Sequence, residues 1–474
     1  MRKYGIICIA LLGAVLPAEA WRFESGRTVL NNTATTPTHT SVTFQTPFDS
    51  IPVVVALPTN DGTDPSDLRI SNISLTGFDV MQVEPEGNDG THDTMTIDYV
   101  AAEPGQHTLP GGSMVIVDRV TTATYQAGGG VGGPEGWDPQ TFPTAFTAAP
   151  IVLAEIQSVN SETGTPPSGV SEPWLSATVG NLAATGFDLA LERSEVNTGT
   201  VVAETIGYIA VETATGDFIS DTNTTIDWSA HDTGRIVRGW NNGCYTSPFS
   251  TTAWTNARVI ATKSSHYGGD GGWVRRCSLT PTQVGLTIDE DINRDTERNH
   301  TTENVSILAF SDSFHANFVV NLGVDKNVAV MEDPINGTTD PFMISGSRVR
   351  YTIDFESLGN LSPDSDTLNF VDEIPADMSL IVSDIAGVGD GPVLWSDGSP
   401  SSDLTYTFTS LASTSDDVAF SNDGGATFVY TPVPLADGSD PAVTHISVSP
   451  KGTFAYVSGA GTPTFSLAMD MIVE

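Results

Sequence analysis

Two kinds of side chain that can contact a polar ligand recur at fixed positions in this sequence. His92 and His300 each lie seven residues before an apolar anchor position in a following strand, and Glu204 and Glu303 each lie four residues before such an anchor. A histidine or a carboxylate in an exposed loop can hydrogen-bond to hydroxyl groups or ligate a cation. The alternative is that these loop residues are only solvated. All four are candidates for ligand contact.

An arginine and two tryptophans lie upstream of the same loops. The planar guanidinium of Arg69 holds its donors in a fork that fits two neighbouring hydroxyl groups, and Arg276 is the nearest counterpart in a later segment. Trp174 and Trp273 occupy equivalent positions, where an indole ring could pack on the apolar face of a sugar. The alternatives are a surface salt bridge for Arg69 and core packing for the two tryptophans.

One acidic segment has a pattern that could bind a metal. "DEDINRDTERNH" places oxygen-bearing side chains at alternate positions, namely Asp289, Asp291, Asn293 and Asp295. This spacing lets the side chains converge on Ca²⁺ in a tight loop, although the segment lacks the Gly and the terminal Glu of an EF-hand. The glycine-rich stretches "GGGVGG" and "SHYGGDGGW" lack the Lys-Ser/Thr ending of a phosphate-binding loop, so both are interpreted as flexible loops or linkers.

The first twenty residues predict export. Arg2 and Lys3 precede an apolar run that is closed by "AEA", which is the pattern of a signal peptide cut after Ala20. Two cysteines then remain, Cys244 and Cys277, and in an oxidising compartment they are expected to form a disulfide. A zinc or thiol site is the alternative, but it would normally require paired cysteine motifs.

The charge of the chain limits its partners. Nineteen basic residues stand against 58 acidic ones, which gives a formal net charge of -39. Such a surface repels nucleic acid and anionic membranes, and no later segment resembles a membrane span. The charge can serve solubility in a salty medium, or Asp-rich loops can use it to bind Ca²⁺.

The elements that would position the candidate residues are repeated. "TGFDV" at 76–80 recurs as "TGFDL" at 185–189 and, more diverged, as "VGLTI" at 284–288. In each copy 21 residues separate the central aromatic or Leu from the anchor in the next strand, where Tyr99, Tyr208 and Ile307 stand. An upstream block also recurs, at 47–56, 145–154 and 253–261. Three matched blocks at one interval indicate a threefold duplication.

The repeated blocks alternate as β-strands. Phe78 and Phe187 lie on the apolar faces of their strands, and the preceding Gly is expected to permit a sharp turn. The predicted fold class is all-β, with tandem antiparallel β-sandwiches. The predicted divisions are a signal peptide at 1–20, three repeats at 21–107, 108–217 and 218–323, and a C-terminal β-sandwich at 324–474.

The repeats resemble the H-type lectin domain. The resemblance rests on "VTFQTPFDSIPVVVALP", the Arg-bearing "DLRISNISLTGFDV", the acidic loop and "IDYVAAE", and it covers roughly residues 21–320. It implies a six-stranded antiparallel sandwich that binds a galactose-type sugar without catalysis, with Arg69 as a sugar contact. Domains of this family form trimers with sugar sites near subunit interfaces, so three copies in one chain suggest a covalently linked pseudo-trimer.

The last part of the chain has a different pattern. Strands are expected in "SRVRYTIDFESLG", "LTYTFTSL", "ATFVYTPV", "THISVSP" and "FSLAMDMIVE", separated by Gly, Asp, Ser and Pro turns. The segments "YTI" and "DEIPA" resemble a conserved repeat domain of bacterial cell-surface proteins. That resemblance implies a stalk or docking module, with an envelope protein as a partner.

No catalytic motif is apparent, since neither GxSxG nor HExxH occurs. We therefore expect a non-catalytic bacterial protein, secreted, periplasmic or held at the cell surface, that binds extracellular glycans or cell-surface polysaccharide. A structural surface, matrix or pilus-associated protein is the alternative. A polysaccharide-degrading enzyme would need two acids from distant strands.

Overall fold

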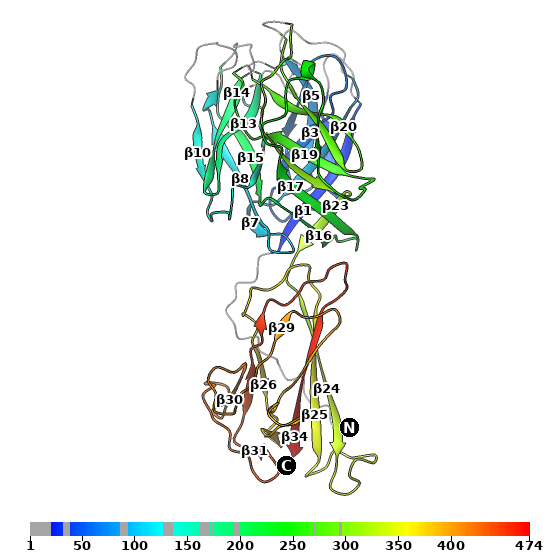
Figure 1. Cartoon of the computed structure of the whole chain (residues 1–474), viewed down its shortest axis with the longest axis vertical. Coiled ribbons are helices and arrows are strands. Elements are labelled where there is room, and N and C mark those ends of the chain that lie inside the picture. Colours follow the sequence, from blue (N-terminus) through cyan, green and yellow to red (C-terminus); the bar gives the residue numbers. More distant parts are fainter. Residues whose placement is uncertain are drawn as a thin grey trace. The chain divides into compact units, whose positions relative to one another are not determined.

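The computed structural model confirms an all-β protein (Figure 1). It describes residues 20–31, 38–85, 93–126, 136–161, 170–171, 174–193, 200–269, 271–292 and 296–474, so the predicted signal peptide lies almost wholly outside it. Within these ranges the helical content is one 3-10 turn, η1 (Trp240–Asn242), and no helix is long and apolar enough to cross a membrane. The chain divides into the repeat unit, Trp21–Phe318, and the C-terminal unit, which begins at Val319.

Each of the three repeats contributes six strands to the repeat unit. The first has β1 (Trp21–Leu30), β2 (Thr40–Thr43), β3 (Val53–Pro58), β4 (Asp67–Ser71), β5 (Gly77–Pro85) and β6 (Met95–Ala102). The second has β8 (Met114–Thr122), β10 (Asp138–Thr141), β11 (Ile151–Ile156), β13 (Leu175–Ala183), β14 (Gly186–Arg193) and β15 (Glu204–Val211). The third has β17 (Thr225–Asp232), β18 (Tyr245–Pro248), β19 (Arg258–Lys263), β20 (Trp273–Leu279), β21 (Gln283–Asp289) and β22 (Val305–Phe310).

The six strands form two antiparallel sheets in every repeat. The first, sixth and third strands make one sheet, and the second, fifth and fourth make the other. Two short strands, β9 (Tyr125–Gln126) and β12 (Val170–Ser171), add parallel pairings to β14 and β5. The apolar faces of the two sheets enclose one core per repeat, as expected of a sandwich.

The repeated aromatic residues fill these cores, as predicted. Phe78 and Phe187 are buried against Tyr99 and Tyr208, with ring centroids 5.2 and 5.0 Å apart. The Gly before each Phe has another role than the expected turn. A Cβ on Gly77 would lie 2.2 Å from the carbonyl oxygen of Val42 in the neighbouring strand, so the close approach of two backbones requires glycine there.

Three further strands interlock the repeats. β7 (Gly105–Thr108), β16 (Ala214–Ile219) and β23 (Phe314–Phe318) each follow the sixth strand of one repeat. Each then pairs with the first strand of another repeat, β7 with β8, β16 with β17, and β23 with β1. The last pairing closes the ring, because the end of the third repeat joins the start of the first. The predicted boundaries after residues 107 and 217 therefore fall inside β7 and β16.

The three repeats also share a common centre, as expected of a covalent pseudo-trimer. The equivalent strands β3, β11 and β19 lie against one another there. Side chains of a neighbouring repeat accept hydrogen bonds from backbone N–H groups at the edges of these strands. The N–H of Val152 donates to Ser306 at 3.1 Å, and the N–H of Val259 donates to Asp98 at 3.1 Å. Such bonds satisfy strand edges that would otherwise be open.

The predicted disulfide is confirmed. Cys244, just before β18, is bonded to Cys277 in β20, with Cα atoms 5.9 Å apart. The bond joins the two edge strands of the three-stranded sheet of the third repeat.

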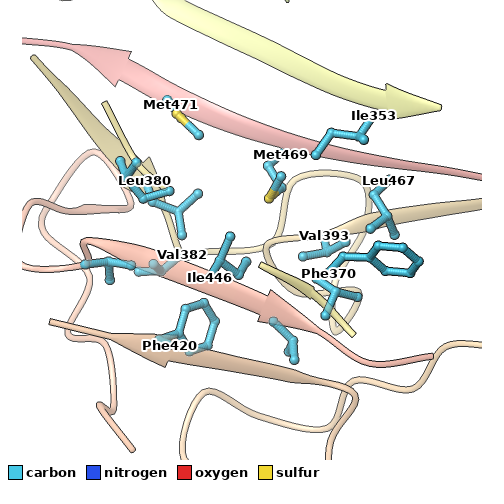
Figure 2. Packing of buried hydrophobic residues seen from close by; sticks show 14 of the residues in the cluster. Ile353, Phe370, Leu380, Val382, Val393, Phe420, Ile446, Leu467, Met469 and Met471 are labelled. Carbon is cyan, nitrogen blue, oxygen red and sulfur yellow. The ribbon is translucent and has the colours of Figure 1, made fainter. Parts of the chain in front are cut away.

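The C-terminal unit is a separate β structure. Its strands are β24 (Leu322–Glu332), β25 (Arg348–Ser357), β26 (Phe370–Glu373), β27 (Met378–Ile381), β28 (Leu394–Asp397), β29 (Leu404–Thr405), β30 (Val418–Ser421), β31 (Ser439–Asp440), β32 (His445–Val448), β33 (Lys451–Gly452) and β34 (Thr464–Val473). β34 is central in the larger sheet, and its Met469 and Met471 point toward Ile446 and Phe420 of the smaller one (Figure 2).

Two predicted strands of this unit are mostly irregular. "LTYTFTSL" pairs only at Leu404–Thr405, and "ATFVYTPV" contributes a single bridge between Tyr430 and Phe420. In the second segment Val429 and Val433 are exposed, so its alternation of apolar residues does not mark a buried strand face.

Candidate functional site

The candidate site is a pocket of about 570 Å³ between the second and third repeats. The second repeat lines it with Trp137, Ala149, Pro150, Gly180, Asn181, Leu182 and Thr213, and the third with Asp232, Ser264, Ser265, His266, Tyr267 and Asn304. Its wall therefore combines two aromatic rings with amide, hydroxyl, imidazole and carboxylate groups. Aromatic side chains together with a few converging polar groups are typical of pockets that bind small molecules.

Trp137 forms the wall on the second repeat. It stands directly before β10, and its indole lies beside Gly180, where a Cβ would be only 3.0 Å from Cη2 of the ring. The next residue, Asn181, has φ of 49° and donates from Nδ2 to Asp188 at 2.6 Å. Gly180, which leaves room for the indole, and Asn181, whose backbone is in the left-handed region, thus shape the turn against which Trp137 packs.

Asp232, the last residue of β17, gives the pocket a fixed carboxylate. Oδ1 accepts hydrogen bonds from the backbone N–H of Gly234 at 2.7 Å and from Nδ2 of Asn304 at 2.8 Å. Oδ2 accepts from the Ser264 hydroxyl at 2.6 Å. Three donors hold the group in one orientation, and Oδ2 keeps the capacity to accept from a ligand hydroxyl.

The loop after β19 presents Tyr267 and His266. Tyr267 is 54% exposed, and the guanidinium of Arg235 lies 3.9 Å from its ring centroid. The Trp137 and His266 rings meet edge to face, with centroids 5.8 Å apart. The aromatic side chains at this edge of the pocket are thus oriented by their neighbours, and the ring of Tyr267 is accessible to a ligand.

Glu303, a predicted ligand residue, instead holds this loop. Its buried carboxylate accepts from the backbone N–H groups of Tyr267 and Gly268, both at 2.7 Å, and from the Ser265 hydroxyl. Burial raises the pKa of Glu303, but the bond to His300 and the charge of Lys263 outweigh it and leave the pKa lowered. The prediction places Glu303 in an exposed loop, whereas the side chain is buried and its carboxylate bonds to the loop of Tyr267 and to His300.

Glu204 makes the same arrangement in the second repeat. It accepts from the Ser158 hydroxyl and from the backbone N–H groups of Asn160, at 3.1 Å, and Ser161, at 2.5 Å. Glu204 is 1% exposed, whereas the prediction places it in an exposed loop. The recurrence of Glu at this spacing reflects a backbone clamp for the loop after the third strand.

His300 is buried beneath the loop, with only 5% exposed, whereas the prediction places it in an exposed loop. Its Nδ1 bonds to Glu290, and its Nε2 lies 3.1 Å from Glu303. Burial lowers the pKa of His300, but the bonds to these two carboxylates outweigh burial and leave the pKa above its ordinary value. His92 lies outside the described residues.

Arg69 and the two tryptophans pack between repeats, which contradicts their predicted exposure to a ligand. Arg69 is 2% exposed, donates to the carbonyl of Leu68 at 2.8 Å, and lies 4.7 Å from the ring centroid of Trp174. Trp174 and Trp273 are buried, with ring centroids 5.2 Å apart. Nε1 of Trp273 donates to the Ser66 carbonyl at 2.8 Å. The core-packing alternative holds for both tryptophans.

Arg276 and Asp289 form buried ion pairs. Arg276 pairs with Asp98 of the first repeat, so its donors are directed inward and not toward a ligand. Asp289 accepts from Arg275 and from Arg298, both at 2.7 Å, which leaves its oxygens committed to two guanidinium groups. Asp291 is buried, and Asn293 and Asp295 lie outside the described residues. In the parts of the chain that the structure describes, no cluster of His, Cys, Asp and Glu could hold a metal ion.

The residues that line the pocket were missed because their signals are weak in sequence. His266 and Tyr267 belong to "SHYGGDGGW", and Trp137 follows "GGGVGG" closely; the sequence predicts flexible loops or linkers for both segments. The usable signal is an aromatic residue next to glycines, since exposed aromatic residues in loops are often binding residues. Comparisons with protein-family models, curated proteins and solved structures found no match for this chain.

Proposed function

We propose that this protein binds extracellular glycans through the pocket between its second and third repeats, without catalysing a reaction. One observation carries the proposal: the accessible ring of Tyr267 and the ring of Trp137 stand beside a carboxylate, Asp232, fixed by three hydrogen bonds. Aromatic rings pack on the apolar faces of sugar rings, and fixed carboxylate and amide groups select hydroxyl geometry.

The charge of the molecule favours neutral sugars as the ligand class. The chain has a net charge of -39, and Asp232 places one carboxylate in the pocket itself. An anionic sugar would be repelled both at long range and at the site. A neutral hexose is consistent with these charges and with a pocket of about 570 Å³.

A glycan array with fluorescently labelled protein tests the proposal. Binding to neutral glycans that is weakened by Trp137→Ala, with unchanged thermal unfolding, would support it. The array is run with and without Ca²⁺, and no binding in either condition would contradict it. That second outcome favours the alternative, a structural surface or matrix protein, for which the interlocked ring of repeats is the supporting observation.

The C-terminal unit is proposed to attach the protein to a cell-envelope partner. It has an edge strand, β24, that pairs on one side with β25 and carries the exposed residues Val324 and Val328. Pull-down of envelope proteins with the full chain and with a chain ending at Phe318 tests this role. Equal recovery of the same proteins by both chains would contradict it.

A further inference from the structure

Three residues occupy the same register position in the first strands of the three repeats. Asp232 pairs with Ser306, Arg119 with Gly207, and Arg27 with Asp98. Each of these partners directly precedes the anchor position of its sixth strand. The ring therefore has an arginine at two of the equivalent positions and an aspartate at the third.

At the interface of the first and second repeats, Arg119 fills the space that corresponds to the pocket. Nη2 of Arg119 donates to the carbonyl oxygen of Ile51 at 2.8 Å and to that of Pro52, and Nε donates to Gln157 at 3.2 Å. Ile51 and Pro52 precede β3 as Ala149 and Pro150 precede β11, and Gln157 follows β11 as Ser264 follows β19. The counterparts Ala149, Pro150 and Ser264 all line the pocket.

The interface of the third and first repeats is occupied in the same way. Nη2 of Arg27 donates to the carbonyl oxygen of Ala257 at 2.9 Å, and Ala257 precedes β19 as Pro150 precedes β11. Asp98 holds this guanidinium through two bonds, of 2.5 Å to Nε and 2.9 Å to Nη2. An arginine again bridges to the backbone that precedes the third strand of the neighbouring repeat.

We infer that Asp232 opens the ligand pocket, and that Arg27 and Arg119 close the two equivalent interfaces, so that the chain binds one ligand. An aspartate is too short to reach the carbonyls of Ala149 and Pro150, and its charge would repel them. Its carboxylate accepts hydrogen bonds instead from Ser264 and Asn304 of its own repeat. Ser264 stands at the position that Gln157 occupies in the second repeat, and its shorter side chain leaves further space in the pocket. The identity of the ligand as a neutral sugar rests on the proposed function, whereas the opening of the pocket does not.

Crystal structures of unliganded variants test the opening directly. Asp232→Arg is expected to place its guanidinium against the carbonyls of Ala149 and Pro150 and to remove the cavity. Arg119→Ser combined with Gln157→Ser is expected to create a cavity between the first and second repeats. Asp227→Arg makes the same charge change on the same strand outside the pocket lining and should leave the cavity intact. A cavity that persists in Asp232→Arg, or none in the double variant, would overturn the inference.

Calorimetric titration with methyl β-galactoside then tests the number of sites. The wild type, Asp227→Arg and the Arg119/Gln157 double variant are each expected to bind one ligand per chain, because the new cavity of the double variant has His39 and Asn160 where the pocket has Trp137 and Tyr267. Asp232→Arg is expected to bind at least about tenfold more weakly. Two sites in the wild type would overturn the inference. If the wild type binds no galactoside and no glycan on the array while the cavities open and close as expected, the roles of Asp232, Arg27 and Arg119 in opening and closing the interfaces stand, and the proposed function fails.

Discussion

The ammonium group of Lys263 and the carboxylate of Glu192 meet in the interior of the repeat unit, although the two residues belong to different repeats. Nζ lies 2.7 Å from Oε1. His266 of the pocket lies on the same carboxylate, with Nδ1 3.2 Å from Oε1. Burial raises the pKa of Glu192, but Lys263 and His266 outweigh burial and lower it to about 2. The pair thus joins the second and third repeats directly behind the pocket.

Glu192→Gln is expected to lower the free energy of unfolding at pH 7 by about 3 kcal/mol, because Lys263 would remain buried without its counter-charge. A carboxylate with a lowered folded-state pKa stabilises the fold above its unfolded pKa of about 4.3. This contribution is lost as the pH falls through about 2. Urea unfolding should therefore show a large difference at pH 7 that shrinks as the pH approaches 2. A difference that does not depend on pH would contradict this account. The double variant Glu192→Leu/Lys263→Met is the control, since it removes both charges.

Glu155→Gln is expected to stabilise the protein at alkaline pH. Glu155 lines a cavity of about 30 Å³ where the three repeats meet, and Asp67 lines it too. Burial, reinforced by the Asp67 carboxyl, raises the pKa of Glu155 well above its ordinary value. The stability that a raised carboxyl pKa contributes is present below the unfolded pKa and is lost as the pH rises through the folded pKa.

Thermal unfolding between pH 4 and pH 8 measures this effect. Wild type and Glu155→Gln should unfold at similar temperatures at pH 4, and the variant should unfold at a higher temperature at pH 8. Glu332→Gln, at an exposed position of β24, is the control and should follow the wild type. A variant that is less stable than the wild type at pH 8 would show that the ionised carboxylate is stabilising.

Glu303→Gln is expected to weaken glycan binding about tenfold or more, because the loop that carries Tyr267 loses its charged acceptor. Glu204→Gln is a matched control, since it removes the same clamp from the second repeat. Both variants should lose about 1–3 kcal/mol of stability. Binding titrations and urea unfolding separate the two effects. Equal loss of binding in both variants would mean that the loop of Tyr267 has no special role.

Removing the disulfide with Cys244→Ser/Cys277→Ser is expected to cost about 3–4 kcal/mol of stability, because the bond closes a loop between residues 33 positions apart. Urea unfolding of the double variant, compared with the wild type under oxidising and reducing conditions, measures the cost. Wild type under reducing conditions should match the variant. No difference between them in oxidising buffer would contradict the prediction.

The strands, the repeat and the cores could be predicted from sequence because each depends on local alternation or on a spacing within one repeat. Phe78 and Tyr99 are 21 residues apart, and the same interval recurs twice. The disulfide followed from cysteine count and compartment. These signals can be recognised in one sequence even when it is not known which distant segments come into contact.

The candidate site depends on pairings that no local pattern encodes. Arg27 reaches a carbonyl 230 residues away, and Lys263 pairs with a carboxylate 71 residues away. Polar residues at a recurring spacing predict ligand contacts, yet Glu204 and Glu303 recur because a backbone loop recurs. Asp232 could have been found only by aligning it with Arg27 and Arg119, which requires the register of the first strands.

The pairing of β1 with β23 constrains the order in which the molecule can fold. Trp21 emerges early during synthesis, but its partner Phe318 follows almost three hundred residues later. Contacts of such sequence separation form slowly and leave a strand edge open until they are made. We therefore expect the first repeat to remain incomplete until the third has been made, so that partly synthesised chains depend on chaperones to keep them from aggregating.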